Sequence, residues 1–180
     1  MRVITGTARG RRLNELKGSE TRPTTDRVKE GVFNIIQFDI EGRRVLDLFG
    51  GTGQLGIECL SRGAESATFV DARTDATRLI RENLELTGLV ERATVLTADY
   101  ATVLGTTREK FDLVFLDPPY QTKLLERSLE LISQFDILRE HGIIVCESPL
   151  DKTLPELSAP YGKYREYRYG KIKVTIYHRD

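Results

Sequence analysis

Four consecutive residues, Asp117-Pro118-Pro119-Tyr120, combine groups that could hold a planar amine. The two prolines have no backbone N–H and stiffen the chain, so that carbonyl oxygens point outward. The carboxylate of Asp117 only accepts hydrogen bonds, and the ring of Tyr120 can stack on a flat base. Together they predict a site that aims the exocyclic amine of a nucleobase at an electrophile, mainly through orientation and charge complementarity. The alternative interpretation is a strand followed by a proline-rich turn.

A second stretch, from Arg44 to Gly56, has the pattern of a buried strand, a tight turn and a helix. Apolar residues stop at the glycines and resume with helical spacing from Leu55. Glycines let the backbone approach a ligand closely, and the start of the following helix adds unpaired N–H groups. The stretch therefore predicts a nucleotide-like ligand. The spelling G-x-G-x-x-G from Gly51 to Gly56 alone favours NAD, but that motif is weak by itself.

Acidic residues follow four expected strands, at Asp47, Asp71, Asp99 and Asp117. In an open α/β sheet, ligands bind beyond the carboxyl ends of the strands. An acid at the spacing of Asp71 from the glycine turn suits the ribose hydroxyls of a nucleoside. Asp47 would repel a pyrophosphate and favour a cation such as an amino-acid ammonium, which points to S-adenosylmethionine. The alternative role of Asp47, compatible with the first, is to pin the turn by accepting backbone N–H groups.

The expected elements alternate along the chain, which predicts an α/β fold with a doubly wound, mostly parallel sheet. Tyr164 to Tyr169 and Lys173 to Tyr177 should form an antiparallel hairpin through Gly170 at the sheet edge. Arg2 to Thr5 and Arg12 to Leu16 could form a small hairpin around Gly6 and Gly10. The other expected strands are Ser66 to Val70, Arg92 to Thr97, Phe111 to Leu116 and Gly142 to Glu147, and the helices run to about Phe38, from Thr74 to Leu86 and from Leu124 to Phe135. We expect a single domain over residues 1–180, with residues 1–23 as a basic extension.

The formal net charge of zero does not by itself indicate a nucleic-acid binder, but the first 30 residues carry eight Lys/Arg against four Asp/Glu. A basic arm on an acidic body is a weak indication of a polyanionic partner, and a solvated surface hairpin is the alternative. The two cysteines suggest neither a disulfide framework nor a zinc site, so we expect core residues and no metal. The N-terminus has no apolar signal segment and no run reaches membrane length, so a cytoplasmic location is expected.

With DLFGGTG followed by DPPY, the chain resembles class I S-adenosylmethionine-dependent methyltransferases that modify exocyclic amines. It is similar along nearly its whole length to the RsmD family of 16S rRNA guanine-N2 methyltransferases. Matching stretches include RVITGTARGRRL, TRPTTDRVKEGVFNII, VLDLFGGTGQLGIECLSRGA, LDPPY and YGKIKVTIYH. This sequence departs from the family's pattern at two positions. It has Gly50 where the family more commonly has alanine, and Lys171 where the family often has an acid. Gly31, inside the first expected helix, should cost helix propensity.

The resemblance implies a Rossmann-like fold, a seven-stranded sheet with an antiparallel last strand, and a site assignment. It implies S-adenosylmethionine as cofactor and 16S rRNA as substrate. The glycine turn would contact the methionine part of the cofactor, Asp71 the ribose, and Asp99 and Tyr100 the adenine. The implied residues are Asp117, Pro118, Pro119 and Tyr120 for catalysis, Asp47, Phe49, Gly50, Gly51, Gly53, Asp71, Ala72, Asp99 and Tyr100 for the cofactor, and Arg9, Arg11, Arg12, Arg22, Thr24 and Arg27 for RNA.

Three other functions stay open at this point. An adenine-N6 methyltransferase acting on DNA or RNA would use the same acceptors. An NAD-dependent oxidoreductase would fit the glycine spelling, but it lacks an obvious acid on the hydride side, since His141 and His178 lie outside the strand-end edge. A non-catalytic RNA-binding module is the third. We expect a monomer that acts on an assembled small-subunit particle, because a small basic arm gives little specificity alone.

Overall fold

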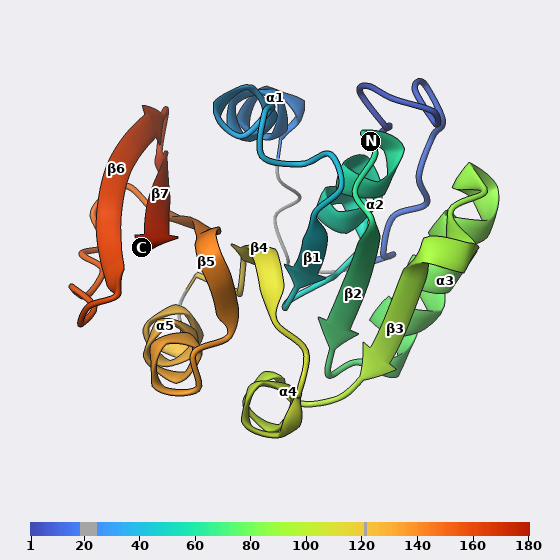
Figure 1. Cartoon of the computed structure of the whole chain (residues 1–180). Coiled ribbons are helices and arrows are strands. Elements are labelled where there is room, and N and C mark those ends of the chain that lie inside the picture. The colour runs from blue at the N-terminus through green and yellow to red at the C-terminus, as the bar shows by residue number, and fades with distance from the viewer. Residues whose placement is uncertain (19–24, 121) are drawn as a thin grey trace.

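The computed structural model describes residues 1–18, 25–120 and 122–180. They form a seven-stranded sheet in the order β3-β2-β1-β4-β5-β7-β6 (Figure 1). The first five strands in this order are parallel, whereas β7 is antiparallel to both of its neighbours, which confirms the expected sheet. The strands span Arg44–Asp47 (β1), Ser66–Asp71 (β2), Ala93–Thr97 (β3), Phe111–Leu116 (β4), Leu138–Pro149 (β5), Tyr161–Tyr169 (β6) and Ile172–Arg179 (β7).

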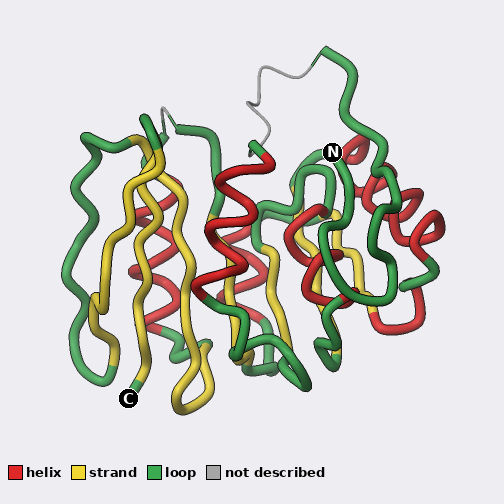
Figure 2. Tube along the Cα trace, turned by 90° about the horizontal axis from the view of Figure 1, so that it is seen from above, coloured by secondary structure: helices red, strands yellow, loops and turns green. Residues whose placement is uncertain are grey.

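Helices cover both faces of the sheet. In Figure 1, α1 and α2 lie above the strands and α4 and α5 below them, and Figure 2 looks onto the upper side, which we call the α1 face. Helix α3 packs into the same core as α1 and α2. In the described part of the chain, no helix has both the length and the apolar character needed to span a bilayer. The helices span Asp26–Ile35 (α1), Gln54–Ser61 (α2), Thr74–Thr87 (α3), Tyr100–Thr106 (α4) and Leu124–Gln134 (α5), with a 3-10 turn at Val90–Arg92.

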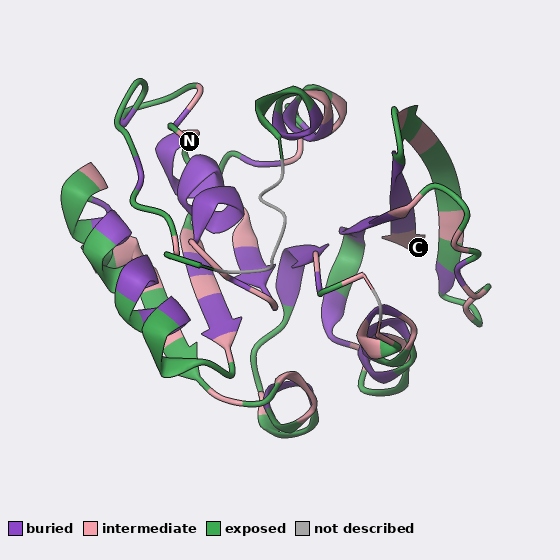
Figure 3. Ribbon diagram, turned by 180° about the vertical axis from the view of Figure 1, so that it is seen from behind, coloured by how far each residue is buried: buried purple, intermediate pink, exposed green. Residues whose placement is uncertain are grey.

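Strand β4 shows why the central strands are apolar throughout rather than alternating. All six of its residues are buried, because helices pack on both of its faces. Leu113 and Phe115 join the core under α1 and α2, while Val114 and Leu116 join the core over α4 and α5. Figure 3 shows the same burial in the centre of the sheet and its loss along β6. The central strands are thereby fixed in register, and their carboxyl ends form one edge that we call the carboxyl edge.

Three expectations from the sequence need correction. Helix α1 ends at Ile35 rather than near Phe38, because Phe38 is 90% exposed and does not continue the buried face. Helix α4 was missed because it has only seven residues, including a glycine, although Asp99 caps its start. The N-terminal hairpin is shorter than expected: backbone bonds join residues 1–3 to residues 10–13 around a bridge between Arg2 and Arg12, while residues 4–8 bond to helix α2.

Candidate active site

The acids that follow the parallel strands meet at the carboxyl edge of the sheet. Asp47 pairs in register with Phe69 and Phe115, and Asp71 pairs with Thr97, so the strands β1 to β4 end at nearly the same level. Asp99 and Asp117 follow within two residues of the ends of β3 and β4. The structure therefore brings the four predicted acids to one edge, as the sequence indicated.

The glycine turn joins β1 to α2 along this edge. Gly51 and Gly53 have φ angles of 57° and 82°, in the left-handed region that favours glycine. The N–H of Gly50 donates to Val70 O at 2.8 Å, and the N–H of Gly53 donates to Gly50 O at 2.7 Å, which ties the turn to β2 and to itself. A side chain at Gly56 would meet the ring of Phe69, its Cβ standing 2.4 Å from Cε1. Close packing of α2 on β2 is thus what this third glycine provides.

Asp47 lies under the turn with only 2% of its surface exposed. Its Oδ2 accepts a hydrogen bond from the N–H of Gly56 at 3.3 Å, so it does pin the turn to α2. Burial raises the pKa of Asp47 to about 7, with the Gly56 bond opposing and the charge of Asp71 adding to the shift. A cation next to Asp47 would reverse this shift, because it would favour the charged carboxylate.

Asp71 is oriented by two backbone donors at the end of β2. Its Oδ2 accepts from the N–H of Gly51 at 3.0 Å, and its Oδ1 accepts from the N–H of Arg73 at 2.9 Å. The intervening Ala72 is exposed. A carboxylate has about four lone-pair sites, so these bonds leave capacity for ligand hydroxyls.

Asp99 and Tyr100 begin helix α4 beyond β3. The Oδ2 atom of Asp99 accepts from the N–H groups of Ala101 and Thr102 at 3.0 and 3.3 Å, as the N-cap of the helix. The ring of Tyr100 packs against that of Phe49, with centroids 5.4 Å apart. Beside them, a hollow of about 490 Å³ opens between α4 and the start of α5, lined by Tyr100, Thr122, Lys123, Leu124, Glu126, Arg127 and Glu130. Its size suits a ligand such as a nucleoside.

The loop from Asp117 to Tyr120 continues β4 at the same edge. Pro118 is buried, whereas Asp117 and Tyr120 are partly exposed. The hydroxyl of Tyr120 donates to Glu147 Oε1 at 2.7 Å, and Glu147 is itself a buried residue of β5. The sequence analysis missed Glu147, whose only signal was a carboxylate at the end of an apolar strand.

Two further hydrogen bonds, which involve Thr122 and Lys152, hold the loop from Asp117 to Tyr120 in place. Thr122 Oγ1 donates to Pro119 O at 2.8 Å, and the ammonium of Lys152 donates to Thr122 O at 2.9 Å. Lys152 also pairs with Glu126 at 3.1 Å, which fixes the beginning of α5. The loop from Asp117 to Tyr120 is thus fixed by contacts from β5, α5 and the segment that follows β5.

The predicted RNA-binding residues lie on the N-terminal segment and at the start of α1. Arg9, Arg11 and Arg12 are exposed on the segment, and Arg27 is exposed in the first turn of α1. Thr25 caps this helix by accepting from the N–H of Val28 at 3.4 Å. Arg22 and Thr24 lie outside the described residues.

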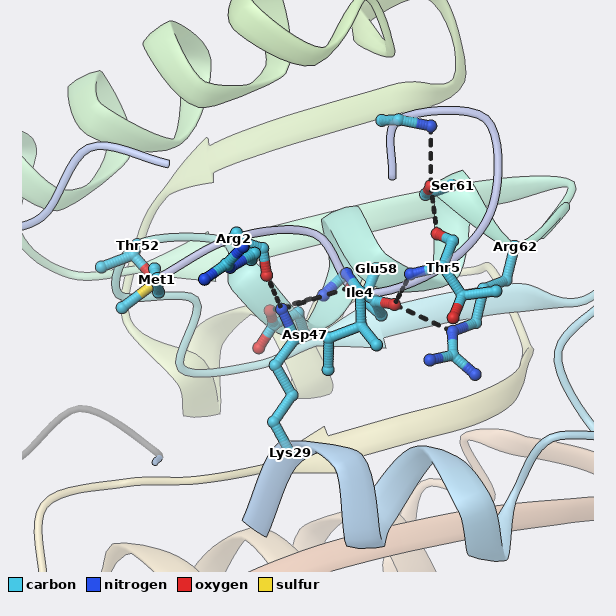
Figure 4. Close-up of polar contacts among 12 residues, drawn as sticks. Met1, Arg2, Ile4, Thr5, Lys29, Asp47, Thr52, Glu58, Ser61 and Arg62 are labelled. Atoms are coloured by element: carbon cyan, nitrogen blue, oxygen red, sulfur yellow. Dashed lines mark hydrogen bonds and ion pairs between the residues drawn. The ribbon is translucent and has the colours of Figure 1, made fainter. Parts of the chain in front are cut away.

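A buried ion pair anchors the N-terminal segment (Figure 4). Lys29 of α1 and Glu58 of α2 are fully buried and lie 3.3 Å apart, and burial lowers the pKa of Lys29. Glu58 also accepts from the N–H groups of Ile4 and Thr5 at 2.9 and 3.0 Å, and it pairs with Arg62. The sequence contained a signal for this pair, since both charges interrupt apolar helical faces, but it did not show that they meet.

Asn83 of α3 connects the same segment to the glycine turn. Its amide Oδ1 accepts from the N–H of Asn14 at 2.8 Å, and its Nδ2 donates to Asn14 O at 3.1 Å and to Thr52 O at 2.8 Å. Asn83 is fully buried, so these bonds satisfy a polar group that would otherwise destabilise the core. The basic segment and the turn are therefore parts of one bonded unit.

The groups at this edge fit a cationic nucleoside such as S-adenosylmethionine. The edge presents carboxylates from four strands, and the buried Oε1 of Gln54, at the start of α2, accepts no hydrogen bond from any described residue. Acceptors in such excess suit a ligand with ammonium and hydroxyl donors and disfavour a pyrophosphate. Cys59 and Cys146 are fully buried and free, and burial raises the pKa of both thiols, so they belong to the core as expected.

Proteins of similar sequence are found along the whole chain. The family model described as conserved hypothetical protein 95 matches residues 1–178. A candidate rRNA methyltransferase of Bacillus subtilis, YlbH, is 42% identical over 180 residues and covers 98% of each chain. The ribosomal RNA small subunit methyltransferase D of Escherichia coli K12 is 33% identical, over 100% of this chain and 90% of the relative.

Solved structures give the same picture of the fold. A candidate methyltransferase from Escherichia coli, yhhF, superposes with a TM-score of 0.89 at 32% identity, covering 100% of this chain and 98% of the other. The Thermus thermophilus 16S rRNA N2 G1207 methyltransferase RsmC, in complex with AdoMet and guanosine, gives a TM-score of 0.74 at 19% identity, covering 91% of this chain and 45% of the other. At that identity, the second likeness concerns the fold alone.

Proposed function

Because the chain belongs to the RsmD family, whose model is described as conserved hypothetical protein 95, we propose that it methylates the exocyclic N2 amine of a guanine in 16S rRNA. S-adenosylmethionine would be the methyl donor. The substrate would be an assembled small-subunit particle in the cytoplasm, and the enzyme would act as a monomer. The observation that carries the proposal is the position of Asp117 to Tyr120 at the end of β4, directly beside the strand that leads into the glycine turn.

Each group at the carboxyl edge has a part in this reaction. Asp47 and the glycine turn would hold the methionine portion of the donor, Asp71 its ribose, and Asp99 with Tyr100 its adenine. Phe49 and Ala72 would complete the pocket. When bound, the donor supplies a methyl group on a positively charged sulfur, and the surrounding carboxylates favour binding of that charge.

The loop from Asp117 to Tyr120 would hold the target base. An exocyclic amine is a poor nucleophile, because its lone pair is delocalised into the ring. If Asp117 and an outward carbonyl of the loop accept both N–H bonds, the lone pair is aimed at the methyl group. Asp117 then accepts the proton that the amine releases. Tyr120 would stack on the base, which must leave its helix or stack to enter the site.

Replacement of Asp117 by Ala tests the proposal directly. With tritiated S-adenosylmethionine and unmethylated small subunits, we expect methyl transfer to fall at least about 100-fold, since the acceptor that orients the amine is lost. Glu140→Ala, which removes an exposed carboxylate far from the site at the start of β5, is the matched control and should keep full activity. Undiminished transfer by Asp117→Ala would contradict the assigned role.

Mass spectrometry of the digested product separates the alternatives. N2-methylguanosine is the expected nucleoside. N6-methyladenosine would overturn the guanine assignment while keeping the amine chemistry. No labelled nucleoside at all, from either particles or free RNA, would favour a non-catalytic RNA-binding module.

A further inference from the structure

The turn between β6 and β7 lies at the carboxyl edge, beside the candidate active site. Ile172 pairs with Tyr169 of β6 on one side and with Pro149, at the end of β5, on the other. One step further along, Lys173 pairs with both Arg168 and Ser148. Since adjacent strands lie roughly 4.8 Å apart, the backbone of Arg168 is about 10 Å from that of Ser148. Ser148 directly follows Glu147, which accepts a hydrogen bond from Tyr120, so the turn borders the loop from Asp117 to Tyr120.

The β6–β7 hairpin is basic, and part of its charge is not neutralised. Lys163 and Lys173 pair with Glu156 and Glu166 at 3.1 and 3.4 Å. Arg168 and the turn residue Lys171 are both exposed, and neither forms an ion pair with any carboxylate of residues 1–18, 25–120 or 122–180. In Figure 3, β6 is mostly exposed along its length while β7 behind it is buried. The two charges therefore face solvent at the edge of the site.

Helix α1 places a third exposed cation near the hairpin, on the α1 face of the sheet. The ring of Tyr169 packs so closely on α1 that a Cβ at Gly31 would stand 2.6 Å from its Cε1. Arg27 lies four residues before Gly31, on the same side of the helix and one turn nearer its start. Arg27 is exposed, and neither Asp26 nor Glu30, the acids beside it on α1, is paired with it. Tyr169 faces α1 together with Ile172 and Val174, whereas Arg168 precedes it in β6 and shares the opposite face with Lys173. Arg27 and Arg168 therefore flank the carboxyl end of the hairpin from opposite faces of the sheet, with Lys171 at the turn between them.

We infer that Arg168 and Lys171 form a surface that contacts RNA phosphates next to the target nucleotide, with Arg27 flanking it on the α1 face of the sheet. The inference rests on the proposed function for the identity of the polyanion. The acids of the candidate active site would repel phosphates, whereas the cations of this surface would attract them. The RNA backbone is therefore held at the border of the site while only the target base enters it. The surface adds a second anchor to the N-terminal arginines, which lie on the other side of the site across α2.

Filter binding to an unmodified 16S rRNA transcript tests the surface. For the variant Arg168→Gln with Lys171→Gln, we expect about tenfold weaker binding. The plot of log affinity against log salt concentration should become less steep by about 1.4, because each lost phosphate contact with a single strand contributes about 0.7 and the variant loses two. The control Arg108→Gln removes an exposed arginine from the opposite, amino-terminal end of β4 and should bind like the wild type. Unchanged thermal unfolding of each variant shows that the fold is kept.

Other outcomes overturn the inference. Binding and salt slope equal to the wild type would remove RNA contact from these residues, and an equal loss in Arg108→Gln would reduce the effect to overall charge. Normal binding to the transcript with a loss of binding to small-subunit particles would indicate a ribosomal protein as partner instead. The charge reversal Lys171→Glu should weaken transcript binding beyond Lys171→Gln, and failure to do so also contradicts the surface. These experiments measure RNA binding, whereas the proposed function is tested by identifying the methylated nucleoside. Failure of the inference can therefore be distinguished from failure of the proposed function.

Discussion

The hydroxyl of Tyr120 lies 2.7 Å from the carboxylate Oε1 of Glu147, which comes from the neighbouring strand β5. Hydrogen bonds to a charged acceptor are stronger than neutral ones, so this contact fixes the direction of the tyrosine ring. Under the proposed function, Glu147 is a positioning residue, because it acts on the base only through Tyr120.

Tyr120 and Glu147 should therefore show coupled effects. We expect Glu147→Ala to lower kcat about 10-fold and Glu147→Gln to lower it much less, since a glutamine oxygen still accepts from the hydroxyl. Tyr120→Phe should cost about as much as Glu147→Ala, and the double variant Tyr120→Phe with Glu147→Ala no more than either. Steady-state methyl transfer measures all four. Additive losses would show that the two residues act independently.

The pKa of Asp47, raised to about 7, predicts a pH-dependent effect on stability. An aspartate of ordinary pKa loses its proton near about pH 4 in the unfolded chain, so the stability held by neutral Asp47 is complete below that pH. It is lost as the pH rises through about 7. In the variant Asp47→Asn the side chain cannot ionise, and its amide oxygen can still accept from Gly56. We expect Asp47→Asn to increase the free energy of unfolding by about 1 kcal/mol or more at about pH 8, and by less at about pH 5.

The same variant should bind the methyl donor less well, because a neutral amide attracts an ammonium less than a carboxylate does. Urea unfolding at the two pH values and calorimetry with S-adenosylhomocysteine measure the two effects. Equal stability of variant and wild type at the higher pH would mean that Asp47 is not destabilising when ionised.

Two glycines of the same motif should respond differently to a methyl group. A Cβ at Gly56 would stand 2.4 Å from a fully buried ring, that of Phe69, so Gly56→Ala should destabilise by about 1–3 kcal/mol or more. A Cβ at Gly50 would stand 2.8 Å from Ile80 Cδ1, the flexible end of a side chain that can shift. Gly50→Ala should therefore stay within about 0.5 kcal/mol of the wild type. Thermal unfolding compares them, and the reverse order would contradict the packing described.

Removing Lys29 and removing Glu58, which form a buried ion pair, should reduce the stability of the fold by different amounts. Glu58→Ala leaves the ammonium of Lys29 buried, together with the N–H groups of Ile4 and Thr5, and we expect a loss of about 3–5 kcal/mol. Lys29→Met leaves Glu58 with those donors and Arg62, so its cost should be clearly smaller. Denaturant unfolding measures both losses. A larger loss for Lys29→Met would show that the lysine, and not the carboxylate, holds the segment.

The acids of the edge could be predicted from the sequence because they depend on local patterns. Buried strands, glycine turns and helix starts are written in consecutive residues, and parallel strands must end at a common edge. Asp47, Asp71, Asp99 and Asp117 were located in this way. The short helix α4 was missed because seven residues carry too little periodicity, even though its capping aspartate was identified for another reason.

The remaining contacts depend on distances that only the folded chain defines. The sequence predicted that Gly31 costs helix propensity. It could not show the benefit of this glycine, which is to let Tyr169, a residue near the other end of the chain, pack closely on the helix. Glu147 is 27 residues from Tyr120, and Glu58 is 29 from Lys29, so no local pattern relates either pair. Such partners are fixed by tertiary packing rather than by spacing in the sequence.

The position of β6 at the end of the sheet order has a practical consequence. Its outer edge has backbone groups that another copy could pair with, and exposed edge strands of this kind promote aggregation unless charges interrupt them. Arg165, Glu166 and Arg168 supply those charges. Replacing these three residues with threonine or valine would leave an uncharged edge strand that promotes aggregation. Glutamine at Arg168, with the other two charges kept, is therefore the safer choice when soluble protein is needed.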